Sequence, residues 1–428
     1  MMKEEVMALM KVQMTSLKKK LIEAIDGISQ KSSQGRAQCL DSVSVAFSKR
    51  YLPDFAIDRR YTITDGIERC LKKGRGTEQA AAAHLAMLLC IQMGAGDLSD
   101  LLSRDLIPVL SFVANDHSVS AHARAKCCNA LGVLTFICNT DDFALTMRNL
   151  QTIFSASYRK GDGTVPIISQ DLAVLHSTAL SAWTLLATVV PITSLPSLSD
   201  LGDLLDSAHL EVRMAAGEAI AVLIEQSRQY SSDEDDDNDD WEPSEELIQK
   251  LHQLSTDSHK YRAKKDRKMQ RSSFRDILRY VEDDASPNVQ IRFGQETLSL
   301  DTWCRKKQYD VFCQVLGSGM NLHLKENDLL REILDLGEKI TDLNVAVSKQ
   351  SKLERHLINA AAFKARSIIR AKTETKDQLP CPHEFYLFIR SFQREFFPLS
   401  NLYRYEYPLN SISVSSRGFI KLLIYPNL

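Results

Sequence analysis

The feature that most constrains the fold is a series of alanine-rich helical segments that recurs along the first 230 residues. Each segment has Ala at close spacing, with Leu, Ile, Val or Met at the i, i+3, i+4 intervals typical of an amphipathic helix. Two of them read EQAAAAHLAMLLCIQ and EVRMAAGEAIAVLIEQ. The segments occupy Ser33–Arg50, Gly76–Met93, Ser118–Cys138, His176–Val190 and Ala208–Ser227.

The spacing of these segments indicates a repeat protein. Alignment on Arg36, Gln79, Arg124 and Arg213 gives steps of 43, 45 and 89 residues, and the last step spans about two periods, with the weaker copy at His176 between them. A period of roughly 40–47 residues is typical of armadillo and HEAT repeats. The innermost helix of each repeat touches a neighbour on both sides, so alanine permits close approach of the backbones.

We therefore predict an all-α fold, an armadillo- or HEAT-like α-solenoid followed by a short helical C-terminal domain. The alternative is an irregular helical bundle. Short strand candidates are few, at Val289–Phe293 and Gly418–Tyr425.

The formal net charge of −2 hides an uneven distribution. Residues 1–230 carry 23 basic and 24 acidic side chains, whereas residues 231–246 carry 10 acidic side chains and no basic one. The remaining residues, 247–428, carry 30 basic and 21 acidic side chains. The acidic segment is predicted to be a loop that cannot fold alone, because its charges repel. The basic C-terminal half points to an anionic partner such as nucleic acid.

Composition also limits the compartment. The nine cysteines are scattered without a CxxC pair, which favours a reducing compartment, the cytoplasm or the nucleus. The N-terminal segment lacks the apolar core of a signal peptide. No stretch approaches the ~18 apolar residues that a membrane-spanning helix needs, so no membrane partner is expected.

A search for catalytic motifs finds no phosphate-binding loop, zinc-protease motif or nucleophile elbow. Asp235, Asp237, Asp239 and Glu246 stand at calcium-loop positions, but Asp240 occupies the place of the glycine that the turn requires. Cys381 and His383 form a single pair, which is too few for a metal site. We therefore predict no catalytic residue, metal, cofactor or small-molecule substrate.

The strongest functional signal is a basic helix that reads KYRAKKDRKMQRSSFR at residues 260–275. At ~100° per residue its cations fall within about 100° of one another. This basic stripe comprises Lys260, Lys264, Arg267, Lys268, Arg271 and Arg275. Phe274, Ile277 and Val281 lie on the other side and are predicted to dock on the solenoid. The stripe is interpreted as a phosphate-backbone contact, and the alternative is an ordinary solvated helix face.

A second basic helix is predicted at residues 351–372, where cations outnumber the single acid, Glu354. Its candidate nucleic-acid contacts are Arg355, Lys364, Arg366, Arg370 and Lys372. These charges lie on several sides of the helix, which suits a channel lined with RNA. The alternative is an exposed helix with ordinary solubilising charge.

At these residues the chain resembles the interferon-related developmental regulator family. The strings LGSGM (316–320) and HLINAAAFKAR (356–366) are specific to it. Further matching stretches are RRYTITDGIERCLKKG (59–74), AAAHLAMLLCIQMG (81–94), RMAAGEAIAVLIE (213–225) and TDSHKYRAKKDRKMQRSSFRDILRYVE (256–282).

The resemblance implies an armadillo-like domain at residues 15–310, containing the acidic loop at 231–246, and a short family domain at 311–373. Residues 374–428 depart from the family and form a divergent tail. The resemblance also implies a regulator without enzymatic activity.

Two family roles follow as expectations. One is binding to translationally inactive ribosomes and their rRNA, with repression of translation and with a C-terminal basic helix in a ribosomal channel. The other is transcriptional co-regulation in the nucleus during differentiation, through co-repressor proteins. The two basic helices favour the first role, because its partner is anionic. An alanine-rich concave groove fits either, since solenoids bind peptides there.

Overall fold

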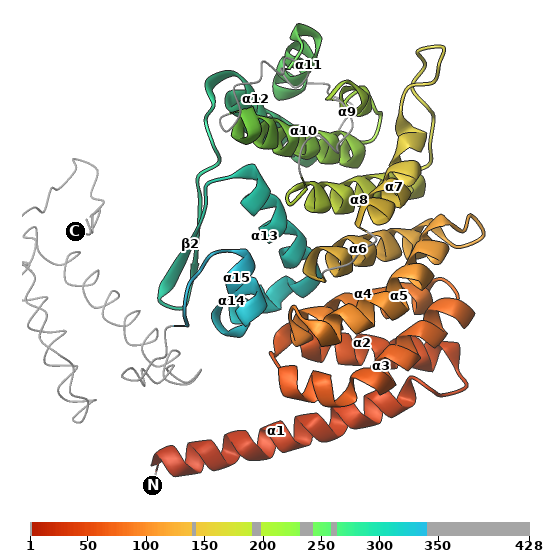
Figure 1. Ribbon diagram of the computed structural model, residues 1–428, viewed down its shortest axis with the longest axis vertical. Helices are drawn as coiled ribbons and strands as arrows, with labels where there is room; N and C mark the ends of the chain where they lie inside the picture. The colour runs from red at the N-terminus through yellow and green to blue at the C-terminus, as the bar shows by residue number, and fades with distance from the viewer. Residues whose placement is uncertain (1, 139–142, 191–197, 232–242, 258–262, 340–428) are drawn as a thin grey trace, which may run out of the picture. The chain divides into compact units, whose positions relative to one another are not determined.

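A computed structural model of the chain describes residues 2–138, 143–190, 198–231, 243–257 and 263–339. In these residues the helices form two rows (Figure 1). The inner row consists of α2 (Ser33–Lys49), α4 (Thr77–Met93), α6 (Ala121–Ile137), α8 (Gln170–Ala187), α10 (Leu210–Ser231) and α12 (Lys264–Asp283), each packed on the next. The outer helices that precede them are α1 (Met2–Gly27), α3 (Pro53–Lys73), α5 (Asp97–Asn115), α7 (Phe143–Phe154), α9 (Leu198–Leu204) and α11 (Glu245–Thr256). The predicted all-α solenoid is confirmed.

The inner row contains the alanine-rich segments, and their small side chains set how closely the helices approach. Residues Ala80–Ala83 of α4 are buried together with nearly all of that helix. At Gly132 of α6, an added Cβ atom would lie only 2.8 Å from Cβ of Ala182 in α8. A larger residue at such a contact would separate the two helices and open voids in the core on either side.

The C-terminal part of the described chain lies along the inner row. An antiparallel hairpin of β1 (Val289–Phe293) and β2 (Glu296–Leu300) leads into α13 (Trp303–Leu316), the short 3₁₀ turn η4 (Gly317–Gly319), α14 (Met320–Glu326) and α15 (Asp328–Ile333). Helix α13 contacts α10, α8, α4 and α2 in turn, and η4 and α14 also contact α2 (Figure 1). These C-terminal elements therefore occupy part of the inner row that a peptide would otherwise contact.

Buried polar contacts fix the two ends of this C-terminal segment. The Glu225 carboxylate of α10 accepts hydrogen bonds from the backbone N–H groups of Trp303 (2.8 Å) and Cys304 (2.7 Å), which begin α13. At the other end, Asn327 Nδ2 donates to the Ile91 carbonyl of α4 at 2.9 Å. Because the first N–H groups of a helix have no partner within it, Glu225 serves as a cap supplied from another helix.

Several sequence-based boundaries can be placed on this fold. The strand expected at Val289–Phe293 is β1. The boundary expected between residues 310 and 311 lies inside α13, a single helix. The basic helix expected at residues 260–275 corresponds to α12 from Lys264 onward, and residues 258–262 lie outside the described residues. The acidic residues 232–242 lie outside the described residues. So does the segment 340–428, for which the sequence predicts a basic helix, a divergent tail and a short strand.

Candidate nucleic-acid interface

Helix α12 is the last helix of the inner row in the described chain, and one of its sides is packed on α10. Phe274 and Ile277 of α12 are buried, as the sequence predicts. They lie against Gly217 of α10, where an added Cβ atom would be 2.8 Å from Phe274 and 3.0 Å from Ile277. Within the described residues no further repeat covers the opposite side of α12, and an outer face of this kind is expected to be polar.

A buried hydrogen-bond cluster sets the rotation of α12 about its axis. Gln270, which is buried, accepts hydrogen bonds on Oε1 from Nε (3.2 Å) and Nη2 (2.8 Å) of Arg213 in α10. Its Nε2 donates to Asp257 Oδ2 (3.2 Å) and to the Leu254 carbonyl (3.3 Å) at the end of α11. Helix α12 is thus held by both neighbouring helices through one side chain.

The C-terminal end of α12 is fixed separately. The Arg228 guanidinium of α10 donates to the carbonyl oxygens of Tyr280 (2.9 Å) and Val281 (2.8 Å) and lies over the Tyr280 ring. The positive guanidinium is favourable there because the unpaired carbonyls at a helix C-terminus carry partial negative charge. With both ends held, the side chains on the solvent face keep a fixed orientation relative to the solenoid.

That solvent face carries most of the basic stripe. Lys264, Lys268 and Arg275 are exposed, and Arg267 and Arg271 are half-buried. None of the ion pairs within the described residues involves Lys264, Lys268, Arg271 or Arg275. Like charges one turn apart repel, so the stripe raises the local positive potential and favours a bound anion. Lys260 lies outside the described residues.

Sequence reasoning missed two cations of this face, Lys265 and Arg279, which are both exposed. Arg279 follows Arg275 by four residues and therefore continues the same line along the helix. The i, i+4 spacing of Arg271, Arg275 and Arg279 is the signal that could have identified it. The exposed Asp276 lies toward one side of this line and offsets part of its charge.

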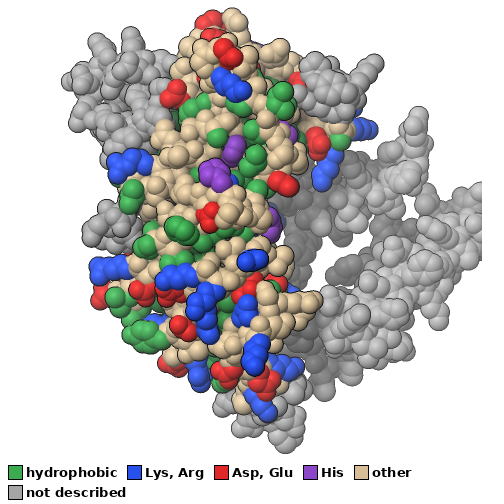
Figure 2. All heavy atoms as spheres, turned by 90° about the vertical axis from the view of Figure 1, so that its right-hand side faces the viewer, with side chains coloured by type: hydrophobic (Ala, Val, Ile, Leu, Met, Phe, Trp, Pro, Cys, Tyr) green, Lys and Arg blue, Asp and Glu red, His purple; other side chains and the backbone are tan. Residues whose placement is uncertain are grey.

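Some other basic side chains of the described chain are paired with acids. Figure 2 shows Lys and Arg mixed with Asp and Glu over the lower half of the face that it presents. On α3, Arg69 pairs with Asp65 at 3.1 Å, and Lys72 pairs with Glu68. Such exposed i, i+4 pairs neutralise each other and stabilise the helix by only about 0.3–0.5 kcal/mol each. The face of α12 differs from these pairs because Lys264, Lys268, Arg271 and Arg275 have no ion-pair partner within the described residues.

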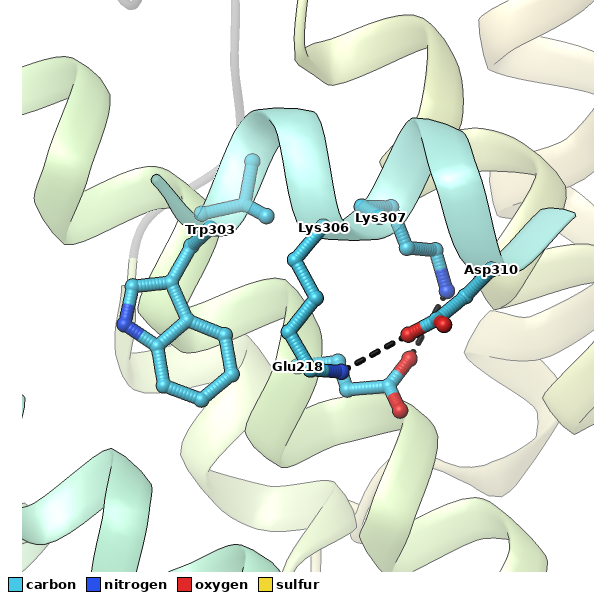
Figure 3. A pocket seen from close by; sticks show the side chains of 6 residues that line it. Glu218, Trp303, Lys306, Lys307 and Asp310 are labelled. Atoms are coloured by element: carbon cyan, nitrogen blue, oxygen red, sulfur yellow. Dashed lines mark hydrogen bonds and ion pairs between the residues drawn. The ribbon is translucent and has the colours of Figure 1, made fainter. Parts of the chain in front are cut away.

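A hollow between α10 and α13 is the other candidate site, and its charges are paired (Figure 3). Lys307 Nζ lies 2.8 Å from Glu218 Oε2 and donates to Ser181 Oγ at 2.8 Å, while Lys306 pairs with Asp310 at 2.7 Å. Burial opposes ionisation of Glu218, but the adjacent Lys307 ammonium outweighs it and lowers the pKa of that carboxyl. These residues fasten α13 to α8 and α10, and they leave little room for a ligand.

The described residues contain no group of three or more His, Cys, Asp or Glu side chains arranged to hold a metal ion. Within the same residues, no helix combines the length and apolar character needed to cross a membrane. The five candidate contacts of the second basic helix, from Arg355 to Lys372, lie outside the described residues and stay predictions.

Comparison with known proteins matches the chain to two family models. The model described as interferon-related developmental regulator matches residues 2–282, and the one described as interferon-related protein conserved region matches residues 327–376. The chain is 42% identical over 370 residues to interferon-related developmental regulator 1 of Homo sapiens, covering 84% of this chain and 81% of that protein. It is 40% identical over 374 residues to interferon-related developmental regulator 2 of Mus musculus, covering 85% and 83%.

Proposed function

Because the chain belongs to the interferon-related developmental regulator family, we propose that it is a non-enzymatic regulator that binds ribosomes through their RNA and represses translation during differentiation. The observation that carries this proposal is the solvent face of α12. Lys264, Lys268, Arg271 and Arg275 have no carboxylate partner in the described chain, yet Gln270 and Arg228 hold the helix rigidly. The proposed site of action is the cytoplasm.

The chemistry of this face suits a phosphate backbone. Successive cations one turn apart are separated by about 5–6 Å along the helix, so a single helix face can contact several phosphates. Binding releases the counterions condensed on the RNA, which supplies affinity without base recognition. The protein is therefore expected to recognise RNA mainly by its charge and shape. The second basic helix, with Arg355, Lys364, Arg366, Arg370 and Lys372, would add contacts of the same kind.

The alternative is a nuclear scaffold for a co-repressor, which would bind peptides along the inner row. That surface is partly occupied by α13 and α14. A peptide there would have to displace buried contacts such as the Phe136–Phe312 ring pair, whose centroids are 6.1 Å apart. This cost supports the ribosomal proposal over peptide capture in the groove.

Gradient fractionation of cell lysates, with and without RNase treatment, tests the proposed function. The full chain should co-migrate with ribosomal particles, whereas a variant carrying Lys264→Glu, Lys268→Glu and Arg271→Glu should stay in the soluble fractions. The variant should keep its fold, because Lys264 and Lys268 are exposed, Arg271 is only half-buried, and the buried anchors Phe274 and Ile277 are unchanged.

The matched control carries Arg59→Glu, Lys73→Glu and Arg75→Glu, which make the same change of net charge at exposed positions near α3. It should co-migrate with ribosomes like the unmodified chain. Equal migration of all three proteins would remove α12 from the mechanism, and absence of the unmodified chain from every ribosomal fraction would favour the co-repressor alternative.

A further inference from the structure

We propose that the loop between α7 and α8 is a docking arm that places two apolar side chains in a hydrophobic pocket of a ribosomal protein. The arm comprises residues 158–168, and its base follows the 3₁₀ turn η1 (Ser155–Ser157). In Figure 1 it is the yellow loop that projects beyond the end of α7. The inference rests on the proposed function, because it names a second contact, with protein rather than RNA, in the same complex.

The base of the arm is held by charged and polar contacts. Arg159 pairs with Asp206 and also lies 3.6 Å from Asp203. The carboxylate of Asp206 is in turn 3.3 Å from Nζ of Lys250 in α11. Where the arm returns toward α8, the Ile168 carbonyl lies 3.0 Å from Nε2 of His209. These contacts join the arm to α9 and, through Asp206, to α11, the outer helix that packs on α12.

The tip of the arm is a structured turn. The Lys160 backbone N–H donates to the Thr164 carbonyl at 2.9 Å, and the Gly163 N–H donates to the Lys160 carbonyl at 2.8 Å. Asp162 Oδ1 accepts from both N (2.9 Å) and Oγ1 (2.6 Å) of Thr164. Gly163 has a φ of 79°, which an L side chain adopts only with strain. The turn is thus ordered by its own hydrogen bonds before any partner binds.

Directly after this turn the arm exposes apolar side chains. Ile167 is fully exposed (102%), more than any other large hydrophobic residue of the described chain, and Val165 is also exposed (36%). Pro166 between them restricts the backbone, so little conformational entropy remains to be lost on binding. Single exposed apolar residues are common on protein surfaces. Two of them separated by a proline on a braced, projecting loop instead resemble the anchors of a protein interface.

The charge of the arm favours protein over RNA as its partner. The only exposed ionic groups at its tip are Lys160 and Asp162, of opposite sign. A phosphate backbone would gain little from this pair, whereas a hydrophobic pocket would gain by removing Val165 and Ile167 from water. The arm therefore complements α12. The solvent face of that helix supplies charge and exposes one large apolar side chain, Met269.

Co-sedimentation of the purified full chain with purified ribosomes, run over a salt series, tests the arm. A Val165→Asp, Ile167→Asp variant should bind at least about tenfold more weakly at every salt concentration, with the salt dependence of the unmodified chain retained. A control with Leu101→Asp and Leu145→Asp, which are exposed leucines of α5 and α7, should bind normally. Thermal unfolding should be unchanged in both variants, because the altered side chains are exposed.

A photo-crosslinking amino acid at position 167 gives a second readout, in which a crosslink to a ribosomal protein supports the arm. Crosslinks only to rRNA, or only to another copy of this chain, would overturn it, as would full binding by the double variant. Failure of the unmodified chain to sediment at all would instead remove the proposed function, and the arm's assignment with it. If binding depends steeply on salt but the Val165→Asp, Ile167→Asp variant binds like the unmodified chain, only the proposed role of the arm would be rejected.

Discussion

At the residue scale, one polar side chain in each of several inner helices ties a repeat to the segment before it. Arg124 Nε donates to the Ala114 carbonyl at 2.8 Å, Arg213 Nη1 to the Ser207 carbonyl at 2.6 Å, and Gln79 Nε2 to the Leu71 carbonyl at 3.1 Å. Arg36 donates in the same way to the turn before α2. Each contact satisfies a carbonyl group that would otherwise be left unpaired near a helix end. These are the residues whose spacing revealed the period.

His176 occupies the equivalent region of α8, and it gives a prediction about pH. It is buried, and its Nδ1 lies 2.6 Å from Ser157 Oγ. Burial, with the Arg124 charge nearby, lowers the pKa of His176 to about 4 from its ordinary value of 6.5. Below pH 6.5 the unfolded chain binds a proton that the folded chain does not, so stability falls as the pH drops from 6.5 toward 4.

Urea unfolding at pH 7.5 and pH 5.0 measures this effect. The His176 contribution to the loss of unfolding free energy should be about 2 kcal/mol. A His176→Asn variant should therefore lose about that much less than the unmodified chain between the two pH values. The exposed His122→Asn control should behave like the unmodified chain. An unchanged pH dependence in His176→Asn would show that this side chain is not held neutral by the fold.

At the element scale, the docking of α13, η4 and α14 on the inner row depends on close backbone contacts. The η4 turn contains Gly317 and Gly319, which lie in the LGSGM string that resembles the family. The sequence alone does not explain why residue 319 is glycine, because the contact joins residues more than 250 positions apart. A Cβ atom at Gly319 would lie 1.7 Å from the Ser48 carbonyl oxygen of α2. The backbone of η4 can approach α2 only when no side chain intervenes.

A Gly319→Ala substitution should therefore destabilise the protein by about 3 kcal/mol or more, because backbone atoms must separate to admit the methyl group. Gly161→Ala, in the turn of the arm, is the matched control, since nothing lies within 4 Å of its added Cβ atom. Denaturant unfolding of the two variants provides the comparison. Equal stability of both variants would mean that η4 does not dock on α2 as described.

At the scale of the whole described chain, the sequence predicted the array of helical repeats but not the docking of α13 along its inner row. The period identified five inner helices because each carries its own apolar pattern. It did not place α13 along the inner row, because that position depends on contacts such as Glu225 with Trp303 that no local pattern encodes. For the site, periodicity identified the cations of α12, whereas the braces Arg213 and Gln270 required the tertiary structure.

Two truncations test whether the C-terminal elements are integral to the array. A chain ending at Asp301 loses α13 to α15 and exposes residues that pack against Phe312, Leu316 and Leu324, all of which are buried. Its melting temperature should fall by at least about 10 °C, since each large buried side chain contributes about 1.5–3 kcal/mol. A chain ending at Lys376 should melt close to the full chain, because the sequence of the removed residues, 377–428, has no periodic apolar face. Similar melting of the Asp301 truncation and the full chain would contradict this arrangement.

The solvent face of α12 is the central claim, and the salt dependence of binding to purified ribosomes tests it most directly. The logarithm of the binding constant falls with the logarithm of the salt concentration by about 0.7–0.9 for each phosphate contact. Reversing Lys264, Lys268 and Arg271 should therefore make the slope shallower by about two to three, whereas the Arg59, Lys73 and Arg75 reversal should leave it unchanged. Identical slopes for the unmodified chain and the α12 variant would show that these cations do not contact RNA.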